Sequence, residues 1–293
     1  MMPSKSHANH IDPRLPELKL PWLLRLTLLL HVAMLLALAV QPSAWRWVLA
    51  VFVLNHLLLS LAGLWPRSRW LGPNWTRLPA ASAQRGEIAL TIDDGPDPEV
   101  TPAVLDLLDR LQVKASFFCI GEKARRHPAL CREIVARGHD VQNHSERHRH
   151  NFSLLGPRGY RRELQAAQDS IAAITGQRPQ FFRAPAGLRN PFLGPVLARM
   201  GLHLAAWTRR GYDTRSGDAA VISRRLLPAV QPGAILLMHD GNCARSPAGV
   251  PVILDVLPGL VRQASASGLR FVTLSHALRS MPASDPHSNT DRP

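Results

Sequence analysis

The pattern of hydrophobic and polar positions changes sharply along the 293 residues, and two nearly unbroken apolar runs lie close to the amino terminus. They occupy 22–40 and 45–65. A helix of about 20 residues, rising 1.5 Å per residue, crosses a hydrocarbon layer about 30 Å thick. The short connection 41–44 therefore predicts a transmembrane hairpin. Tryptophans suited to the headgroup region stand at the ends of the runs, at Trp22, Trp45, Trp47 and Trp65.

Two other interpretations of these runs stay open. Ala37-Leu38-Ala39 resembles the cleavage site of a signal peptide, although the second run would still anchor a processed chain. Polar Asn55 and His56 also suit a buried hairpin of a soluble protein.

Basic residues around the hairpin predict its orientation. Four lie before or just inside the first run and four follow the second, whereas the turn region carries only Arg46. An excess of Lys and Arg retains helix ends in the cytoplasm. We therefore expect an inner (cytoplasmic) membrane protein whose part after residue 65 is cytoplasmic. The flanking residues are Lys5, Arg14, Lys19, Arg25, Arg67, Arg69, Arg77 and Arg85.

Beyond the hairpin, strand-like and helix-like patterns alternate. This alternation predicts a parallel sheet or barrel with catalytic loops at the carboxyl ends of its strands. We expect a basic segment at 1–21, a juxtamembrane linker at 66–85, one domain at 86–280 and a disordered tail at 281–293. The expected strands are 87–92, 114–120, 139–141, 203–207, 234–238 and 271–273, and the expected helices are 101–111, 122–137, 158–175, 191–200, 219–230 and 250–267.

The charge balance favours anionic partners without choosing among them. Lys and Arg number 35 against 21 Asp and Glu, a formal charge of +14 that suits lipid headgroups, phosphate-linked substrates or nucleic acid. The basic residues at 125, 126, 147, 149, 161 and 162 lack the interleaved aromatics of a single-strand binder, so no nucleic-acid partner is expected. Three cysteines cannot all pair within the chain, which fits a reducing compartment.

Two short motifs in the first half of the domain carry candidate chemistry. Asp93 and Asp94 end an apolar strand before Gly95-Pro96, where both carboxylates could reach one site or serve ordinary turn chemistry. His144 and His148, four residues apart, would share one side of a helical turn and suit a metal, with His150 as a rival ligand. An exposed His-rich loop is the alternative for the second motif.

Two further motifs follow later in the chain. Arg183-Ala184-Pro185-Ala186-Gly187 would place a guanidinium beside a carboxylate and expose a backbone N–H at a tight turn. His239 stands at the carboxyl tip of the apolar strand 234–238. Each motif taken alone also fits a loop or a structural residue.

In this order, the four motifs resemble the polysaccharide deacetylase family, of the nodulation-factor and chitin deacetylase type, grouped as carbohydrate esterase family 4. The resemblance covers about 87–276 and includes Ala115-Ser116-Phe117-Phe118, Gly121 and Gly138-His139. It implies an α/β fold, a distorted (β/α)7 barrel that here follows a two-helix transmembrane hairpin. It also implies hydrolytic removal of an N- or O-acyl group from a carbohydrate.

The same resemblance implies a metal site and a set of catalytic roles. It makes Asp94, His144 and His148 the ligands of a divalent transition metal, expected to be zinc. Three protein ligands leave a position for water, as in catalytic sites. By the resemblance, Asp93 is the base, Arg183 holds it, Ala186 supplies an oxyanion N–H, His239 is the general acid and Asp213 orients it.

The chain departs from the family pattern at three positions. Ala186 stands where an aromatic residue is frequent, Arg210 where the family tends to have Asp, and Thr214 where Trp is usual. These departures concern the Asp213 assignment and the sugar-binding wall, not the three metal ligands.

The expected function is that of a membrane-anchored, metal-dependent deacylase of an N-acylated amino sugar. A cytoplasmic domain would act on a lipid-linked sugar, with acetyl or formyl as the acyl group. One alternative keeps the chemistry outside the cytoplasm, on peptidoglycan or exopolysaccharide. The others are a catalytically silent membrane or nucleic-acid binding module and an inactive relative.

Overall fold

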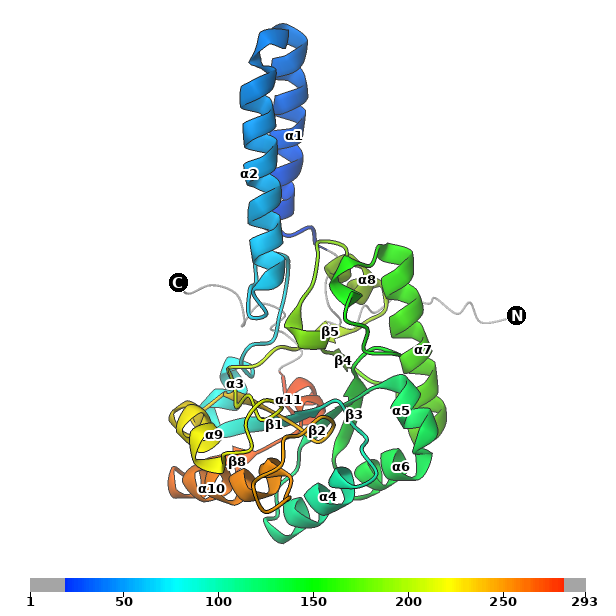
Figure 1. Ribbon diagram of the computed structural model, residues 1–293, viewed down its shortest axis with the longest axis vertical. Coiled ribbons are helices and arrows are strands. Elements are labelled where there is room, and N and C mark those ends of the chain that lie inside the picture. Colours follow the sequence, from blue (N-terminus) through cyan, green and yellow to red (C-terminus); the bar gives the residue numbers. More distant parts are fainter. Residues whose placement is uncertain (1–18, 282–293) are drawn as a thin grey trace, which may run out of the picture.

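The computed structural model describes residues 19–281, so most of the expected basic segment and nearly all of the expected tail lie outside it. Helices α1 (Trp22–Val40) and α2 (Trp45–Leu64) form a hairpin that projects from an α/β domain (Figure 1). A short 3₁₀ turn, Pro42–Ala44, joins them. Both helices are long and apolar enough to cross a membrane by length and composition.

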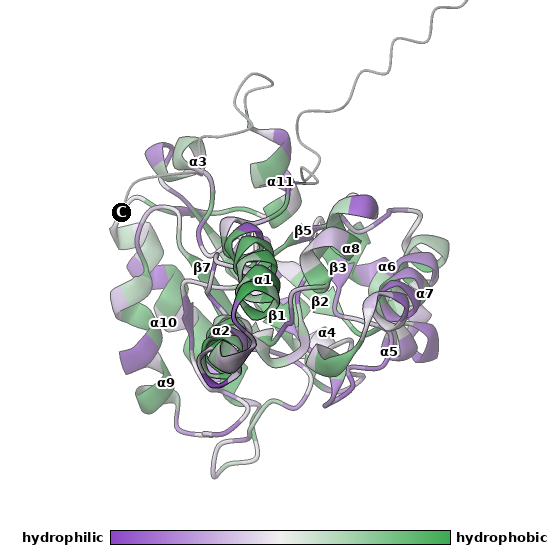
Figure 2. Cartoon of the chain, turned by 90° about the horizontal axis from the view of Figure 1, so that it is seen from above, coloured by the Kyte–Doolittle hydropathy of each residue, from purple (hydrophilic) through white to green (hydrophobic). Residues whose placement is uncertain are grey.

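The hairpin is not part of the core of the domain. Only 17% and 22% of the residues in its two apolar windows are buried, and most residues of the two helices are hydrophobic (Figure 2). The principal polar contact between the helices is a hydrogen bond from Thr27 Oγ1 to Asn55 Oδ1, at 3.2 Å. The structure therefore gives no support to a hairpin buried inside a soluble protein.

Strand β1 (Glu87–Asp93) occupies the centre of a parallel half-barrel sheet. It pairs with β2 (Ser116–Cys119) on one side and with β7 (Ile235–His239) on the other. Seven strands follow the order β5-β4-β3-β2-β1-β7-β6, and β8 (Arg270–Phe271) pairs with the start of β1. The expected α/β barrel fold is confirmed. The remaining strands are β3 (Asp140–Asn143), β4 (Phe181–Phe182), β5 (His203–Leu204) and β6 (Arg209–Arg210).

Both faces of β1 are covered, as expected for a parallel strand. Ile88, Leu90 and Ile92 pack in a cluster with residues of α4 and α10, while Ala89 belongs to a second cluster on the opposite face. The alternation along a strand therefore turns Asp93 toward the barrel interior. The helices of the domain are α3 (Ala80–Gln84), α4 (Val100–Arg110), α5 (Gly121–Arg126), α6 (Pro128–Ala136), α7 (Pro157–Thr175), α8 (Leu193–Arg199), α9 (Ala219–Leu226), α10 (Val252–Ala266) and α11 (Leu274–Arg279).

Local corrections concern short elements. The helix expected over 122–137 is two helices, α5 and α6, which meet at His127. Pro128 has no N–H to continue the first helix, but it suits the first position of the second. Strands β4 and β6 and helix α11 were not expected. The two strands have two residues each, too short for a periodic pattern.

The segment 66–85, expected to be a linker, packs into the domain. Trp75 N–H donates to Leu204 O at 2.8 Å, and Ala206 N–H donates to Trp75 O at 2.9 Å. Leu78 N–H donates to Gly233 O at 2.8 Å, just before helix α3 (Ala80–Gln84). The burial of Trp75 and Leu78 explains why the segment is fixed to the domain despite its Pro- and Arg-rich composition.

The base of the hairpin is fixed to the loop that follows β4. Arg189 N–H donates to Gly63 O at 3.1 Å, and Arg189 Nη2 donates to Ser68 O at 2.5 Å. A Cβ on Gly63 would overlap the carbonyl of Arg189, and a Cβ on Gly187 would lie 2.5 Å from Pro66 Cβ. The end of α2 and this loop are therefore in direct backbone contact.

This contact predicts that Gly63→Ala destabilises the full-length protein. A methyl group forced against a backbone carbonyl costs about 1–3 kcal/mol, which lowers Tm by roughly 2–10 °C in a domain of this size. Gly259→Ala in α10 is the matched control, because its nearest new neighbour is flexible Arg262, 3.9 Å away. Thermal unfolding in detergent compares the two variants. Equal Tm values for them would contradict the close packing at Gly63.

Candidate active site

The two consecutive carboxylates reach one site because the chain turns between them. Asp93 ends β1 with its side chain inward, and Asp94 has a φ of 72°, in the left-handed region. Both side chains are buried. Adjacent strand residues ordinarily point to opposite faces, and the left-handed Asp94 removes that separation.

Arg183 lies completely buried at the centre of this site. Its Nη1 donates to Asp93 Oδ1 at 2.6 Å and to Thr91 Oγ1 at 2.9 Å. Nε and Nη2 donate to the carbonyls of Ala205 and Ala206, at 3.1 and 2.8 Å. Burial lowers the pKa of Arg183, and the charge of Asp93 opposes that shift. The guanidinium thus holds one oxygen of Asp93 and leaves Oδ2 toward the site.

Asp94, His144 and His148 form a cluster of three candidate metal ligands. Asp94 Oδ1 lies 3.2 Å from Nε2 of each histidine, and the three ligand atoms lie within 4.8 Å of one another. Among the residues that the structure describes, this buried oxygen has no hydrogen-bond donor. An orphaned buried carboxylate oxygen facing two imidazoles fits a divalent cation.

Hydrogen bonding around His144 supports the same assignment. Its Nδ1 lies 2.9 Å from the carbonyl of Arg183, which can only accept, so Nδ1 carries a proton. Nε2 is then the ring nitrogen that faces Asp94, and in the neutral imidazole its lone pair is available to a metal while the other ring nitrogen orients the ring.

Electrostatics in the cluster follow from burial and close charges. Burial and the neighbouring His144 lower the pKa of His148 to about 4, so its imidazole is neutral at neutral pH. Burial alone would raise the pKa of Asp94, but His144 and His148 hold it well below its usual range. A neutral imidazole and an ionised carboxylate are the forms that bind a metal.

The two histidines do not lie on a helical turn as expected. They follow β3 in an irregular loop, where Ser145 and His148 have φ values of 63° and 48°. Ser145 Oγ accepts a hydrogen bond from His148 N–H at 3.0 Å and stabilises the loop. His150, the rival ligand, is exposed and is not in the cluster.

His239 and Asp213 form a second pair beside the carboxylates. His239 ends β7 in register with Asp93, and its Nδ1 lies 3.0 Å from Asp213 Oδ1. Its backbone N–H donates to Asp213 Oδ2 at 2.7 Å. Burial opposes protonation of His239, but the hydrogen bond and charge of Asp213 raise the pKa of this histidine above its usual value. The structure thus brings Asp213 to His239 despite Arg210 and Thr214.

Ala186 lies on the loop after Arg183, in the short turn Pro185–Gly187. It is exposed and has a φ of 55°, unusual for a residue with a side chain. A small residue reduces the steric bulk at this rim of the site.

Three contacts of the site were not anticipated. Thr91 binds Arg183, and it could have been inferred because it lies two residues before Asp93 on the same strand face. Lys123 Nζ donates to Asp94 O at 2.7 Å, and Asn242 Nδ2 donates to Asp94 Oδ2 at 3.2 Å. Nothing in the local sequence distinguishes these last two residues.

Comparisons with known proteins agree with the fold. The model of the polysaccharide deacetylase family matches residues 80–205. A peptidoglycan-N-acetylglucosamine deacetylase of Bacillus cereus is 32% identical over 194 residues, which cover 66% of this chain and 88% of that protein. A chitooligosaccharide deacetylase of Sinorhizobium fredii is 36% identical over 166 residues, covering 56% and 76%.

Solved structures show the same similarity. A peptidoglycan N-acetylglucosamine deacetylase in complex with an N-hydroxybenzamide derivative has a TM-score of 0.64 at 28% identity, covering 71% of this chain and 94% of that one. A family 4 carbohydrate esterase of Streptomyces lividans with acetate has a TM-score of 0.57 at 30% identity, covering 64% and 91%.

Fold and site together define a hydrolase that acts on carbon–nitrogen bonds other than peptide bonds. The chain belongs to the polysaccharide deacetylase family, carbohydrate esterase family 4. The relatives named as deacetylases favour an enzyme over a membrane or nucleic-acid binding module.

The geometry predicts that His148→Ala abolishes stoichiometric metal binding. Removal of one of three ligands should weaken affinity at least about 100-fold, since loss of an outer-shell partner already costs 10–100-fold. The matched control is His150→Ala, two residues away and outside the cluster, which should keep its metal. Elemental analysis of the purified proteins measures both. Metal loss in the His150 variant alone would refute the ligand set.

Proposed function

We propose that this protein is a membrane-anchored, metal-dependent deacetylase that hydrolyses the N-acetyl group of an amino sugar. The observation that carries the proposal is the Asp94, His144 and His148 cluster lying beside Asp93, whose carboxylate Arg183 holds. Relatives named as peptidoglycan and chitooligosaccharide deacetylases support an N-acetylated sugar as substrate.

The donor set of two imidazoles and a carboxylate suits zinc. Asp94, His144 and His148 would hold the metal, which when bound lowers the pKa of a water molecule and polarises the acyl carbonyl. Asp94 is positioned by two hydrogen bonds. Asn242 Nδ2 donates to its Oδ2, and Lys123 Nζ donates to its main-chain carbonyl.

The residues around the cluster divide the proton transfers of amide hydrolysis. Asp93 accepts the proton of the attacking water through the oxygen that Arg183 leaves available. The Ala186 N–H donates to the oxyanion that develops on the acyl carbonyl. His239, held by Asp213, gives a proton to the departing nitrogen, so that the products are acetate and the free amino sugar.

The natural substrate that we propose is an amino sugar carried by a lipid. The loop with Ala186 contacts Gly63 near the end of α2 and Pro66 just after it. With the hairpin inserted, one rim of the site would lie near the membrane surface. A sugar presented at the bilayer would be within reach, and its phosphate would suit the basic residues after the hairpin. Acetyl is the acyl group of the named relatives, and formyl is the related alternative.

A second candidate keeps this chemistry and places the domain outside the cytoplasm, acting on peptidoglycan or exopolysaccharide. The names of the Bacillus cereus and Listeria monocytogenes relatives, both peptidoglycan-N-acetylglucosamine deacetylases, favour it. The basic residues around the hairpin favour the cytoplasmic side.

For the mechanism, we expect Asp93→Asn to keep its metal and lose turnover by roughly 100-fold to 10,000-fold, the usual contribution of a general base. Acetate release from an N-acetylated chitooligosaccharide and metal content are measured together. The control is Asp169→Asn, which makes the same charge change at an exposed side chain of α7 and should be fully active. Loss of metal together with activity would mean that Asp93 and Asp94 have exchanged roles.

For the location, we expect a cysteine placed in the tail by Ser284→Cys to resist an impermeant thiol reagent in intact cells. Ser43→Cys, in the turn between α1 and α2, is the matched control and should be modified. Cys119 and Cys131 are buried, and replacing half-buried Cys243 by Ser removes the remaining background. Modification at residue 284 but not at 43 would reverse the topology and favour the extracytoplasmic polysaccharide.

A further inference from the structure

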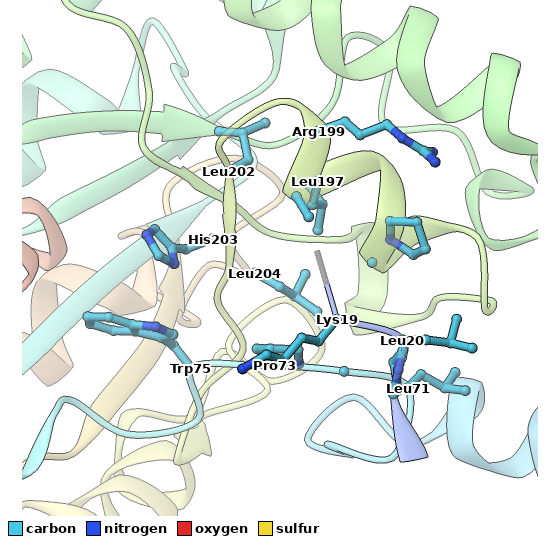
Figure 3. A pocket seen from close by; sticks show the side chains of 15 residues that line it. Lys19, Leu20, Leu71, Pro73, Trp75, Leu197, Arg199, Leu202, His203 and Leu204 are labelled. Carbon is cyan, nitrogen blue, oxygen red and sulfur yellow. The ribbon is translucent and has the colours of Figure 1, made fainter. Parts of the chain in front are cut away.

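A second pocket lies apart from the catalytic residues, at the base of the hairpin. It has a volume of about 270 Å³ and lies between the residues that precede α1, the segment that follows α2, and helix α8 with β5 (Figure 3). Leucines from all of these segments line it, namely Leu20, Leu71, Leu197 and Leu204. None of the proposed catalytic or metal-binding residues does.

The position of this pocket places it at the headgroup layer of a membrane. Its wall includes Lys19, Leu20 and Pro21, the three residues before the first residue of α1. Three tryptophans, Trp22, Trp65 and Trp70, meet at the same base. The ring centroid of Trp70 lies 6.0 Å from that of Trp22 and 6.3 Å from that of Trp65. These rings are 52%, 50% and 38% exposed, as expected for tryptophans at a membrane interface.

The lining combines an apolar interior with cations at the rim. Lys19 and Arg199 are exposed and belong to segments far apart in sequence, and the guanidinium of Arg199 extends away from the middle of the pocket (Figure 3). An apolar chain with an anionic head satisfies both parts of such a site. Anionic lipids attract basic residues at this level of the bilayer.

We propose that this pocket binds one anionic phospholipid of the surrounding membrane. An acyl chain enters between Leu71, Leu197 and Leu204. The phosphate lies at the rim, where the long side chains of Lys19 and Arg199, which point to opposite sides of the pocket in Figure 3, would turn toward it. The site requires the membrane insertion proposed above but not the catalytic mechanism. A bound lipid would join the segments before α1 and after α2 to α8, and so would fix the domain against the bilayer.

Native mass spectrometry of the full-length protein in detergent tests this proposal. Delipidated protein is titrated with phosphatidylglycerol and with phosphatidylcholine of identical chains. We expect one tightly bound phosphatidylglycerol and at least tenfold weaker phosphatidylcholine, since each well-placed cation contributes about 1 kcal/mol, or about fivefold. Equal affinity for the two lipids would overturn the proposal.

Two variants test the binding of the lipid headgroup and of the acyl chain separately. Lys19→Glu/Arg199→Glu should remove the preference for phosphatidylglycerol, whereas Arg224→Glu, an exposed change on distant α9, should preserve it. Ala198→Phe, which fills the pocket, should weaken binding of both lipids. Unchanged binding in the Ala198 and Lys19/Arg199 variants would place the lipid elsewhere and refute the site. Carbonate extraction of membranes tests insertion separately, because release of the wild-type protein would contradict insertion itself.

Discussion

The site depends on one buried ion pair, between Arg183 and Asp93. A fully buried guanidinium is stable only where its donors and its charge are satisfied, and breaking such a pair costs about 3–5 kcal/mol. Here the partners come from β1 and from the chain between β5 and β6, and the ring of Phe118 on β2 lies 4.1 Å away. Satisfying one cation therefore requires three parts of the half-barrel to be in place. The same requirement orients the carboxylate that we assign as the base.

Arg183 also links that carboxylate to the candidate metal ligands. Its main-chain carbonyl accepts the hydrogen bond of His144 Nδ1, so the side chain and the backbone of one residue position two different functions. Asp94, turned back by its left-handed backbone, completes the cluster beside Asp93. A shift of the loop after β4 would therefore disturb the proposed base and the ligand together, although one ends β1 and the other follows β3.

The same loop connects the chemistry to the hairpin. Six residues after Arg183, the backbone of Arg189 meets Gly63 at the end of α2, and Gly187 packs against Pro66. The hairpin is thus not joined to the domain by a flexible linker, since 66–85 packs on the half-barrel and contributes Trp75 and Leu78 to its core. The position of the candidate site relative to the hairpin is therefore fixed by packing.

The sequence by itself determined the features that depend on neighbouring residues alone. The apolar runs predicted α1 and α2 almost to the residue, and four short motifs predicted Asp93, Asp94, His144, His148, Arg183 and His239 as candidates. Only the tertiary structure decided that Asp213 reaches His239, that His150 stays outside the cluster, and that Gly63 contacts Arg189. Periodicity and turn chemistry act over a few residues, whereas these contacts join segments whose proximity depends on strand register and on burial of the whole chain. Trp75 shows the difference plainly, because its Pro- and Arg-rich surroundings resemble a linker until the half-barrel provides the surface that buries it.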